Sequence, residues 1–291
     1  STLMRSSAAS DVYKRQGSIV SPELPIEFIN TGELDIKTTY VLPVTIKSVE
    51  GIGVLQSAKT YYYVFRGASL INVVCNISRN RAYPDFKNDS KFNNLTENTM
   101  EILFKANSFP NTLNTLMGIE SNYLLRIGDA TIPNNQLQVA TSVNNCTSAD
   151  LQLESGKWYH VAVAFNKGNV KVYINGVEKL SGSTGKSSVS LGAKHTNEED
   201  GSRCFWVGYS YKDDRYFDGV VSEVRIWNRA LTAEEIQATN HFYTIEPESE
   251  GLIAYWKFDE GSGTVAKDYS VSGYDLTIEK EPKWESVSLP Q

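Results

Sequence analysis

The sequence predicts an all-β chain, in which an antiparallel β-sandwich of the jelly-roll type follows a small β-sandwich-like module. Apolar and polar residues alternate with a period of two over several short segments, which is the pattern of half-buried strands. Turns rich in Gly and Asn separate these segments, and only one short helix is signalled. Many short strands joined by such turns favour two packed antiparallel sheets.

The length of 291 residues is enough for about two domains. Residues 1–16 show no periodicity and no apolar region of a signal peptide, so we expect a non-native or disordered leader there. We expect residues 17–72 to form the small all-β N-terminal module, as a partial domain. Residues 73–291 are expected to form the β-sandwich.

The N-terminal module contains two predicted strands. Residues 34–47 alternate between apolar and polar side chains, and Pro43 within them indicates an edge strand or a bulged one. Lys59–Phe65 is the second predicted strand and is rich in aromatic residues. Gly51 and Gly53 lie in the turn between them.

The clearest strands of the sandwich lie near its middle. Alternation predicts three apolar strand faces, made by Met100, Ile102, Phe104 and Ala106, by Tyr159, Val161, Val163 and Phe165, and by Val170, Val172 and Ile174. Asn166–Gly168 is predicted to be a three-residue hairpin loop. Asn175-Gly176 is predicted to be a tight hairpin turn, because both of its central residues tolerate positive φ.

Three later strands and one helix complete the prediction. The strands are expected at Phe205–Tyr211, Val220–Trp227 and Leu252–Phe258. Shared apolar faces are expected for Val220, Val224 and Ile226, and for Leu252, Ala254, Trp256 and Phe258. Thr232 and Glu235 have the spacing of a capping box, which predicts a short helix from Ala233 to about Thr239.

The charge balance excludes one large class of partner. Lys and Arg number 28 and Asp and Glu number 34, which gives a net charge of −6. A nucleic-acid-binding protein needs a basic face to displace phosphate counterions, so we expect no nucleic-acid partner. No apolar run approaches the about 18 residues of a membrane-spanning helix, so no transmembrane segment is expected. The three cysteines are expected to be isolated thiols, with one disulfide as the alternative.

Three segments resemble a known family. Lys157–Phe165 (KWYHVAVAF) with Val172–Gly176 (VYING) resembles the central hairpin of laminin-G-like, concanavalin A-like lectin/glucanase domains. Phe217–Thr232 and Gly251–Gly261 (GLIAYWKFDEG) resemble two further motifs of that family. The last motif opens the domain in many members but comes last here. The resemblance implies a concanavalin A-like sandwich.

The N-terminal module adds a second resemblance. The segments YVLPVTIKSVEG and YYYVFRGASLIN are similar to a two-module arrangement of bacterial surface lipoproteins, in which a domain of unknown function precedes the laminin-G-like domain. This resemblance implies an extracellular or cell-surface location, with a suspected outer-membrane lipid anchor. It also implies an oligosaccharide or polysaccharide as partner.

The sequence gives no sign of a catalytic site. A retaining glycosidase needs two carboxyl groups about 5–5.5 Å apart, and the alternating Glu/Asp motif that presents them on such sandwiches is absent. Glu246, Glu248 and Glu250 alternate, but Pro247 interrupts them, so we interpret them as a solvated connector. Glu223 has Arg225 two residues along, which indicates an ion pair. We interpret His160 as structural and expect no catalytic residue.

A glycan site needs flat rings and hydrogen-bonding carboxylates, and one segment offers both. The predicted ligand-binding residues are Trp206, Tyr209, Tyr211, Asp213, Asp214 and Tyr216. The alternative is that these rings pack in the core and the two aspartates form a solvated turn.

Calcium is the cofactor that the resemblance suggests, held by loop carboxylates because this hard cation prefers oxygen ligands. The predicted metal ligands are Asp259 and Asp268, with Glu198–Asp200 as a second candidate segment. The alternative interpretation is an ordinary acidic turn in each case.

The leading hypothesis is a non-catalytic carbohydrate-binding protein of the bacterial cell surface. Two alternatives stay open. One is a protein-binding adhesion or scaffold module, and the other is a glycoside hydrolase with a site that we did not identify.

Overall fold

The computed structural model describes residues 34, 38–48, 56–65, 70–196 and 203–290. The chain divides into two compact units, residues 1–69 with 290–291 and residues 70–289. The expected leader at residues 1–16 lies outside the described residues.

The described part of the first unit is a pair of antiparallel strands. Strand β1 (Tyr40–Thr45) pairs with β2 (Thr60–Phe65), and a 3₁₀ helix (Gln56–Ala58) precedes β2. Both strands fall within the segments predicted to be strands. Pro43 lies opposite Tyr62 in this two-stranded sheet, where its missing N–H is tolerated.

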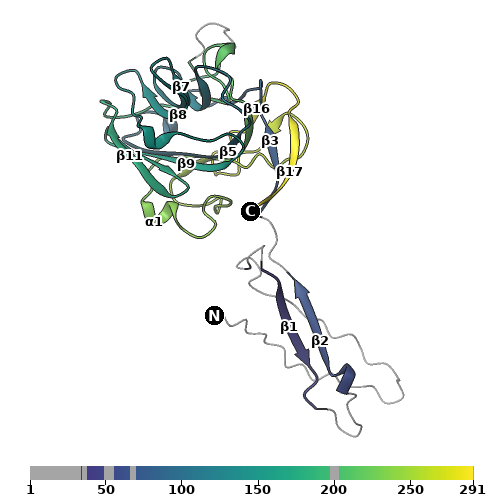
Figure 1. Ribbon diagram of the computed structural model, residues 1–291. Helices are drawn as coiled ribbons and strands as arrows, with labels where there is room; N and C mark the ends of the chain where they lie inside the picture. The colour runs from purple at the N-terminus through teal and green to yellow at the C-terminus, as the bar shows by residue number, and fades with distance from the viewer. Residues whose placement is uncertain (1–33, 35–37, 49–55, 66–69, 197–202, 291) are drawn as a thin grey trace. The chain divides into compact units, whose positions relative to one another are not determined.

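The second unit is a sandwich of two antiparallel sheets (Figure 1). In the eight-stranded sheet the order is β11 (Val177–Ser183), β10 (Asn169–Ile174), β9 (Trp158–Asn166), β5 (Glu97–Ala106), β13 (Gly219–Trp227), β3 (Ile71–Asn76) and β17 (Lys283–Leu289), with β14 (Leu252–Trp256) also paired to β13. In the seven-stranded sheet the order is β15 (Val265–Ala266), β16 (Leu276–Ile278), β4 (Ala82–Pro84), β12 (Trp206–Val207), β6 (Asn114–Ile119), β7 (Tyr123–Asp129) and β8 (Ile132–Thr141). Three further 3₁₀ helices span Ser90–Phe92, Ala149–Leu151 and Asp213–Arg215.

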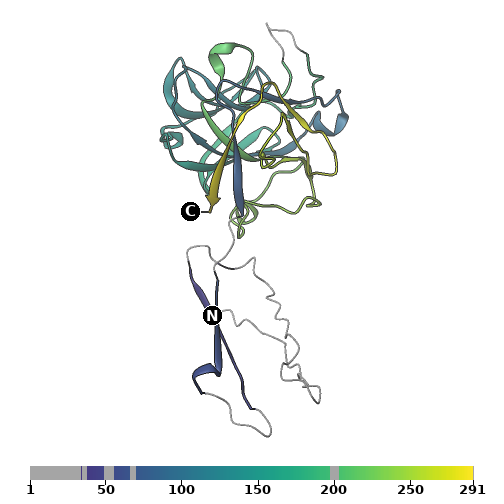
Figure 2. The ribbon, with the colours of Figure 1, turned by 90° about the vertical axis from the view of Figure 1, so that its right-hand side faces the viewer.

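The main core lies between the two sheets and confirms the expected fold class. The apolar faces predicted for β5, β9 and β10 all point into this core, as Ile102, Val163 and Val172 illustrate. Residues two apart on a strand point the same way, so alternation identified these faces directly. Strand β17 lies beside β3 at one edge of the eight-stranded sheet (Figure 2). Ends of the unit that are distant in sequence are therefore hydrogen-bonded neighbours.

Two hairpin turns follow the local sequence. Asn175 and Gly176 both have positive φ, 50° and 76°, and connect β10 to β11 as predicted. The loop between β9 and β10 is shorter than the predicted three residues. Asn166 pairs with Asn169, so only Lys167 and Gly168 form the turn. A two-residue turn with positive φ at both positions matches the right-handed twist of the flanking strands, which explains why the loop is shorter than predicted.

Two predicted strand faces are wrong at one residue each, because β-bulges interrupt the alternation. On β13 a bulge lies between Ser222 and Arg225, so Val220 faces the outer side while Val224 lies in the main core. On β14 the extra residue Ile253 turns Leu252 to the outer side. A bulge shifts every earlier residue of its strand to the opposite face.

The outer side of the eight-stranded sheet is covered by residues 228–250, which we name the cover segment. It contains the helix α1 (Ala233–Ile236), which Figure 1 shows on the side of this sheet away from β7 and β8. Thr232 and Glu235 form the predicted capping box, and the helix ends before the expected Thr239. Leu231 and Ile236 are buried with Trp227 and Tyr255 against the sheet. Among the described residues, no helix is long and apolar enough to cross a membrane.

Candidate functional site

The predicted ligand-binding rings lie on the outer side of the seven-stranded sheet. Strands β4 and β12 pair there through Ala82 and Val207, which both point into the core. Their neighbours Tyr83 and Trp206 therefore point outward, and alternation on the predicted strand Phe205–Tyr211 likewise puts Trp206 opposite Val207. We name the surrounding group the aromatic patch, and its members are Arg81, Tyr83, His195, Trp206, Tyr209, Tyr216 and Glu279.

Edge-on ring contacts hold the aromatic patch together. Trp206 contacts Tyr83 and Tyr209 edge-to-face, with centroids 5.2 and 5.1 Å apart. Tyr216 lies 4.9 Å from Tyr209, and His195 stacks on Tyr83 with a centroid distance of 3.4 Å. Such contacts stabilise the rings relative to one another beyond the burial of their area.

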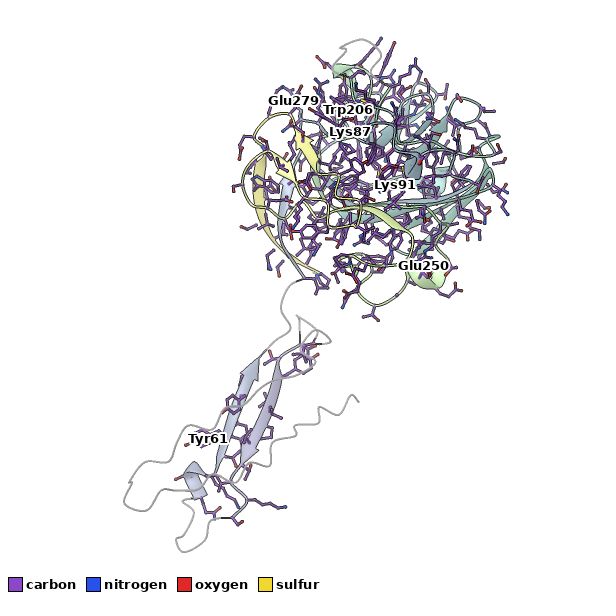
Figure 3. All side chains as sticks on the ribbon, turned by 180° about the vertical axis from the view of Figure 1, so that it is seen from behind. Tyr61, Lys87, Lys91, Trp206, Glu250 and Glu279 are labelled. Atoms are coloured by element: carbon purple, nitrogen blue, oxygen red, sulfur yellow. The ribbon has the colours of Figure 1, made fainter. Side chains whose placement is uncertain are left out.

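A guanidinium group lies over two of these rings. Arg81 Cζ lies 4.9 Å from the centroid of the Trp206 ring and 4.6 Å from that of Tyr209. Arg81 Nη2 also donates to Glu279 Oε1 at 2.5 Å, so the ion pair covers the ring floor. Figure 3 labels Trp206 and Glu279 on this unit.

Because Arg81 covers the rings of Trp206 and Tyr209, these two residues have a different role from the one predicted. Trp206 and Tyr209 are each only 3% exposed, so they form the floor of the patch and offer no open face for stacking. Tyr216 is half-buried. The predicted strand ends at Val207 because Gly208 has a φ of +79°, and this bend brings Tyr209 beside Trp206.

The remaining predicted residues lie just beyond the patch. Asp213 and Asp214 are exposed and begin a 3₁₀ helix, as the solvated-turn alternative had it. Tyr211 is half-buried, and the cations of Arg215 and Lys212 lie 5.2 and 5.4 Å from its ring centroid. Tyr211 thus lies among basic side chains and separate from the Trp206 floor.

The aromatic patch contains a positive charge on Arg81, a negative charge on Glu279, and several N–H and O–H groups. Burial raises the pKa of Tyr216 to about 12. The negative charges of Asp213 and Glu279 also raise this pKa, while the positive charge of Arg81 opposes the rise. The phenol is therefore a neutral donor at physiological pH. The indole N–H of Trp206 and the Nε–H of Arg81 are buried and have no hydrogen-bond partner. The partly exposed side chains of Arg81 and Glu279 therefore supply the donor and the acceptor that a polar ligand can reach.

Sequence reasoning missed four of the seven members of the aromatic patch. Arg81, Tyr83 and Glu279 are far from Trp206 in sequence and come near it only in the fold, whereas His195 lies eleven residues before Trp206 in a segment outside the strands. The position of Tyr83 between buried Ala82 and Pro84 was a usable signal, whereas no local pattern marks Arg81 or Glu279.

A second polar group, which we name the Glu101 cluster, is buried beneath the cover segment. Oε1 of Glu101 lies 2.6 Å from His241 Nε2 and 3.3 Å from His160 Nε2. Its Oε2 accepts from Trp227 Nε1 at 2.6 Å and lies 3.7 Å from Arg225 Nη1. Arg225 Nη1 also donates to the carbonyl of His241 at 2.7 Å. The cluster thus joins β5, β9 and β13 to the cover segment.

Within the described residues, Glu101, His160 and His241 form the single group of three side chains whose ligand atoms could converge on a metal ion. All three are buried. However, N–H groups already surround both carboxylate oxygens, and the Arg225 guanidinium supplies a positive charge nearby. A cation would have to displace these donors and approach that charge. We therefore interpret the cluster as a structural tie.

The pKa values agree with a structural role. Burial alone would raise the pKa of Glu101, but contacts with His160 and His241 and the charge of Arg225 hold it well below its ordinary value. Burial lowers the pKa of His160 despite the neighbouring Glu101. At neutral pH the cluster therefore contains an ionised carboxylate and a neutral His160.

The carboxylates considered for catalysis fall into two environments. Arg225 Nη2 donates to Glu223 Oε2, which confirms the expected ion pair. Glu246, Glu248 and Glu250 are all exposed, as expected for a solvated connector.

The two predicted calcium ligands have different surroundings. Asp268 is buried, and its Oδ1 accepts N–H groups of Tyr255 and Ser270 while its Oδ2 accepts that of Tyr274, all at 2.8–2.9 Å. These bonds fix the loop after β14. Asp259 is exposed. The second candidate segment, residues 198–200, lies outside the described residues.

Comparisons with known proteins agree with this architecture. A family model described as the concanavalin A-like lectin/glucanases superfamily matches residues 80–237. A protein from Bacteroides ovatus that is proposed to bind carbohydrate shares 26% identity, with a TM-score of 0.64 over 87% of this chain and 70% of that one. The search of curated proteins found no match.

Two further solved structures are similar at lower identity. A heptameric pentraxin from Limulus polyphemus has 14% identity and a TM-score of 0.41, over 60% of this chain and 83% of that one. Domain 4 of an extracellular arabinanase from Geobacillus stearothermophilus, in complex with arabinotriose, has 20% identity and a TM-score of 0.44, over 74% and 91% of the two chains.

Proposed function

Since this chain belongs to the concanavalin A-like lectin/glucanase superfamily, we propose that it is a non-catalytic carbohydrate-binding protein whose ligand lies on the aromatic patch. The similarity to the Bacteroides ovatus protein, itself proposed to bind carbohydrate, supports the ligand class. The observation that carries the location is the Arg81–Glu279 pair above a ring floor at the outer face of a rigid sheet.

The chemistry of the patch suits sugar hydroxyls. A hydroxyl group both donates and accepts, so it can bridge a guanidinium and a carboxylate held side by side. Arg81 and Glu279 provide such a pair, with side chains 21% and 33% exposed. The half-buried ring of Tyr216 adds apolar surface for the C–H groups of a sugar ring. The buried floor keeps these groups in place, so little ordering is needed on binding.

The absence of catalysis is part of the proposal. Two observations support it. Glu223, the one glutamate on a strand that was considered for catalysis, forms an ion pair with Arg225. Glu246, Glu248 and Glu250 lie exposed in a connector. Incubation of the full chain with candidate polysaccharides should release no reducing sugar. Release that is lost in Glu223→Gln would overturn this part.

Calorimetric titration tests the binding site. The probes are oligosaccharides from arabinan, xylan, β-glucan and mucin, added to the full chain. We expect heat with at least one probe, and Arg81→Met and Tyr216→Ala should each weaken its affinity at least about fivefold, or about 1 kcal/mol. The matched control is Tyr61→Ala, because Tyr61 is 62% exposed on the first unit and should leave the affinity unchanged. No heat with any probe, or equal affinity in all variants, contradicts the proposal.

A bound calcium ion at Asp259 and Asp268 stays a prediction. An ion that binds the folded state raises the melting temperature by mass action. We expect calcium chloride to raise it relative to chelator, and Asp259→Asn to remove the difference. Equal melting temperatures in both solutions would rule out this site.

We also propose that the protein works outside the cell, as a surface lipoprotein. The similarity of the N-terminal module to bacterial surface lipoproteins supports this location. Recovery of the protein in the membrane fraction with a covalently attached lipid is the expected result in its source cells. Recovery in the cytosol would exclude it.

A further inference from the structure

A cavity of about 210 Å³ lies where the eight-stranded sheet splits. Strand β13 pairs with β3 at Val220 and Val221 but with β14 from Val224 onward. The two neighbours diverge on either side of the β13 bulge, so one edge of β13 is left without a partner strand over the bulge. Bulges of this kind often re-aim a side chain beside a functional site.

The bulge directs a charged side chain to this opening. Glu223 has a φ of +50°, lines the cavity and is only 2% exposed. Its Oε2 accepts from Tyr255 Oη at 2.6 Å and from Arg225 Nη2. Two donors from neighbouring positions therefore hold the carboxylate in one orientation. Burial raises the pKa of Glu223, while Arg225 opposes that rise.

The rest of the lining supplies both donors and acceptors. Tyr243 and Thr244 come from the cover segment, and Lys257 and Asp259 follow β14. The carbonyl of Lys257 accepts from Ser222 Oγ at 2.9 Å, which holds the end of β14 against the bulge. The lining residues therefore include two acids, one lysine, a tyrosine, a serine, a threonine and an asparagine. Such a mixture suits a ligand whose groups both donate and accept.

We propose that this cavity binds a single sugar residue, as a second site separate from the aromatic patch. The choice of a sugar rests on the proposed function, whereas the location rests on the cavity itself. Its volume is smaller than the about 300–1,000 Å³ of clefts for drug-sized ligands, which fits one hydroxyl-bearing ring. The patch lies on the seven-stranded sheet and the cavity at the split in the other sheet, so the two sites can be tested separately.

Amide chemical shifts of the full ¹⁵N-labelled chain provide the test. The probes are D-glucose, D-galactose, N-acetyl-D-glucosamine and L-arabinose, each titrated alone. We expect at least one to shift the amides of Asn72 and Thr244 at the cavity. Thr244→Trp, which fills the mouth from an exposed position, should weaken this binding at least tenfold. Glu223→Gln should weaken it about tenfold through loss of a charge-assisted hydrogen bond.

Controls separate this inference from the proposed function. Thr131→Trp is the matched control, because Thr131 is exposed in the turn between β7 and β8 and should leave cavity binding unchanged. Tyr216→Ala should leave cavity binding unchanged as well. Shifts confined to patch amides would overturn the cavity site while leaving carbohydrate binding intact. No shift with these probes and no heat with the oligosaccharides would overturn both.

Discussion

Replacement of Glu101 by Gln should destabilise the second unit more than any surface substitution. Glu101 is fully buried and accepts from Trp227 Nε1 and His241 Nε2, both at 2.6 Å. A glutamine offers one acceptor oxygen, so its NH₂ group must face one of these N–H donors. It also removes the negative charge that faces Arg225 at 3.7 Å. Removal of one partner from a buried charged group costs about 3–5 kcal/mol.

The magnitude can be measured by urea unfolding followed through tryptophan fluorescence. All five tryptophans lie between residues 158 and 284, so the signal reports on the second unit only. For a unit of about 220 residues, 3–5 kcal/mol corresponds to a fall in melting temperature of roughly 6–20 °C. The matched control is Glu178→Gln, which breaks the exposed pair with Lys171 and should leave the midpoint unchanged. A loss below about 1 kcal/mol for Glu101→Gln would refute the structural tie.

Two further predictions use the same unfolding assay. The pKa of His160 is lower in the folded state than in the unfolded chain. Its neutral form therefore stabilises the fold above about pH 6.5, and this contribution to the free energy of unfolding is lost as the pH falls below that value. The lowered pKa of Glu101 adds a further loss of stability below about pH 4.5. The urea midpoint should therefore fall between about pH 7.5 and 5.5, and a slope that His160→Gln leaves unchanged would contradict this assignment. Gly118→Ala should cost more than about 1 kcal/mol, since φ is +120° and the added Cβ would lie 2.4 Å from the carbonyl of Tyr123. Gly261→Ala is its control, because no atom lies within 4 Å there, and an equal cost at both sites would show that the clash has no effect.

Local sequence was sufficient for most strands and turns. Alternation identified the buried faces of β5, β9 and β10, because side-chain direction on a regular strand depends only on residue parity. The Asn175-Gly176 turn and the Thr232 capping box were also predictable, since each depends on the conformational preferences of a few adjacent residues.

Alternation predicted the wrong strand face where a β-bulge inserts an extra residue. Val220 and Leu252 were assigned to the wrong face because the bulges in β13 and β14 depend on pairing with other strands. The same limit applied to Trp206 and Tyr209. Alternation on the predicted strand Phe205–Tyr211 puts Trp206 and Tyr209 on opposite faces, but the bend at Gly208 brings them together. Their burial beneath Arg81 was not predictable either, because Arg81 lies more than a hundred residues earlier.

The sequence by itself determined that this chain contains an antiparallel β-sandwich and, for its regular strands, which side chains point into the core. Only the tertiary structure decided that Arg81 and Glu279 cover the rings and that Glu101 joins both buried histidines. It also decided that Glu223 lines a cavity between diverging strands. The physical reason is that strand periodicity is a local steric property of the backbone. Charge pairs and cavities depend instead on which distant strands become neighbours.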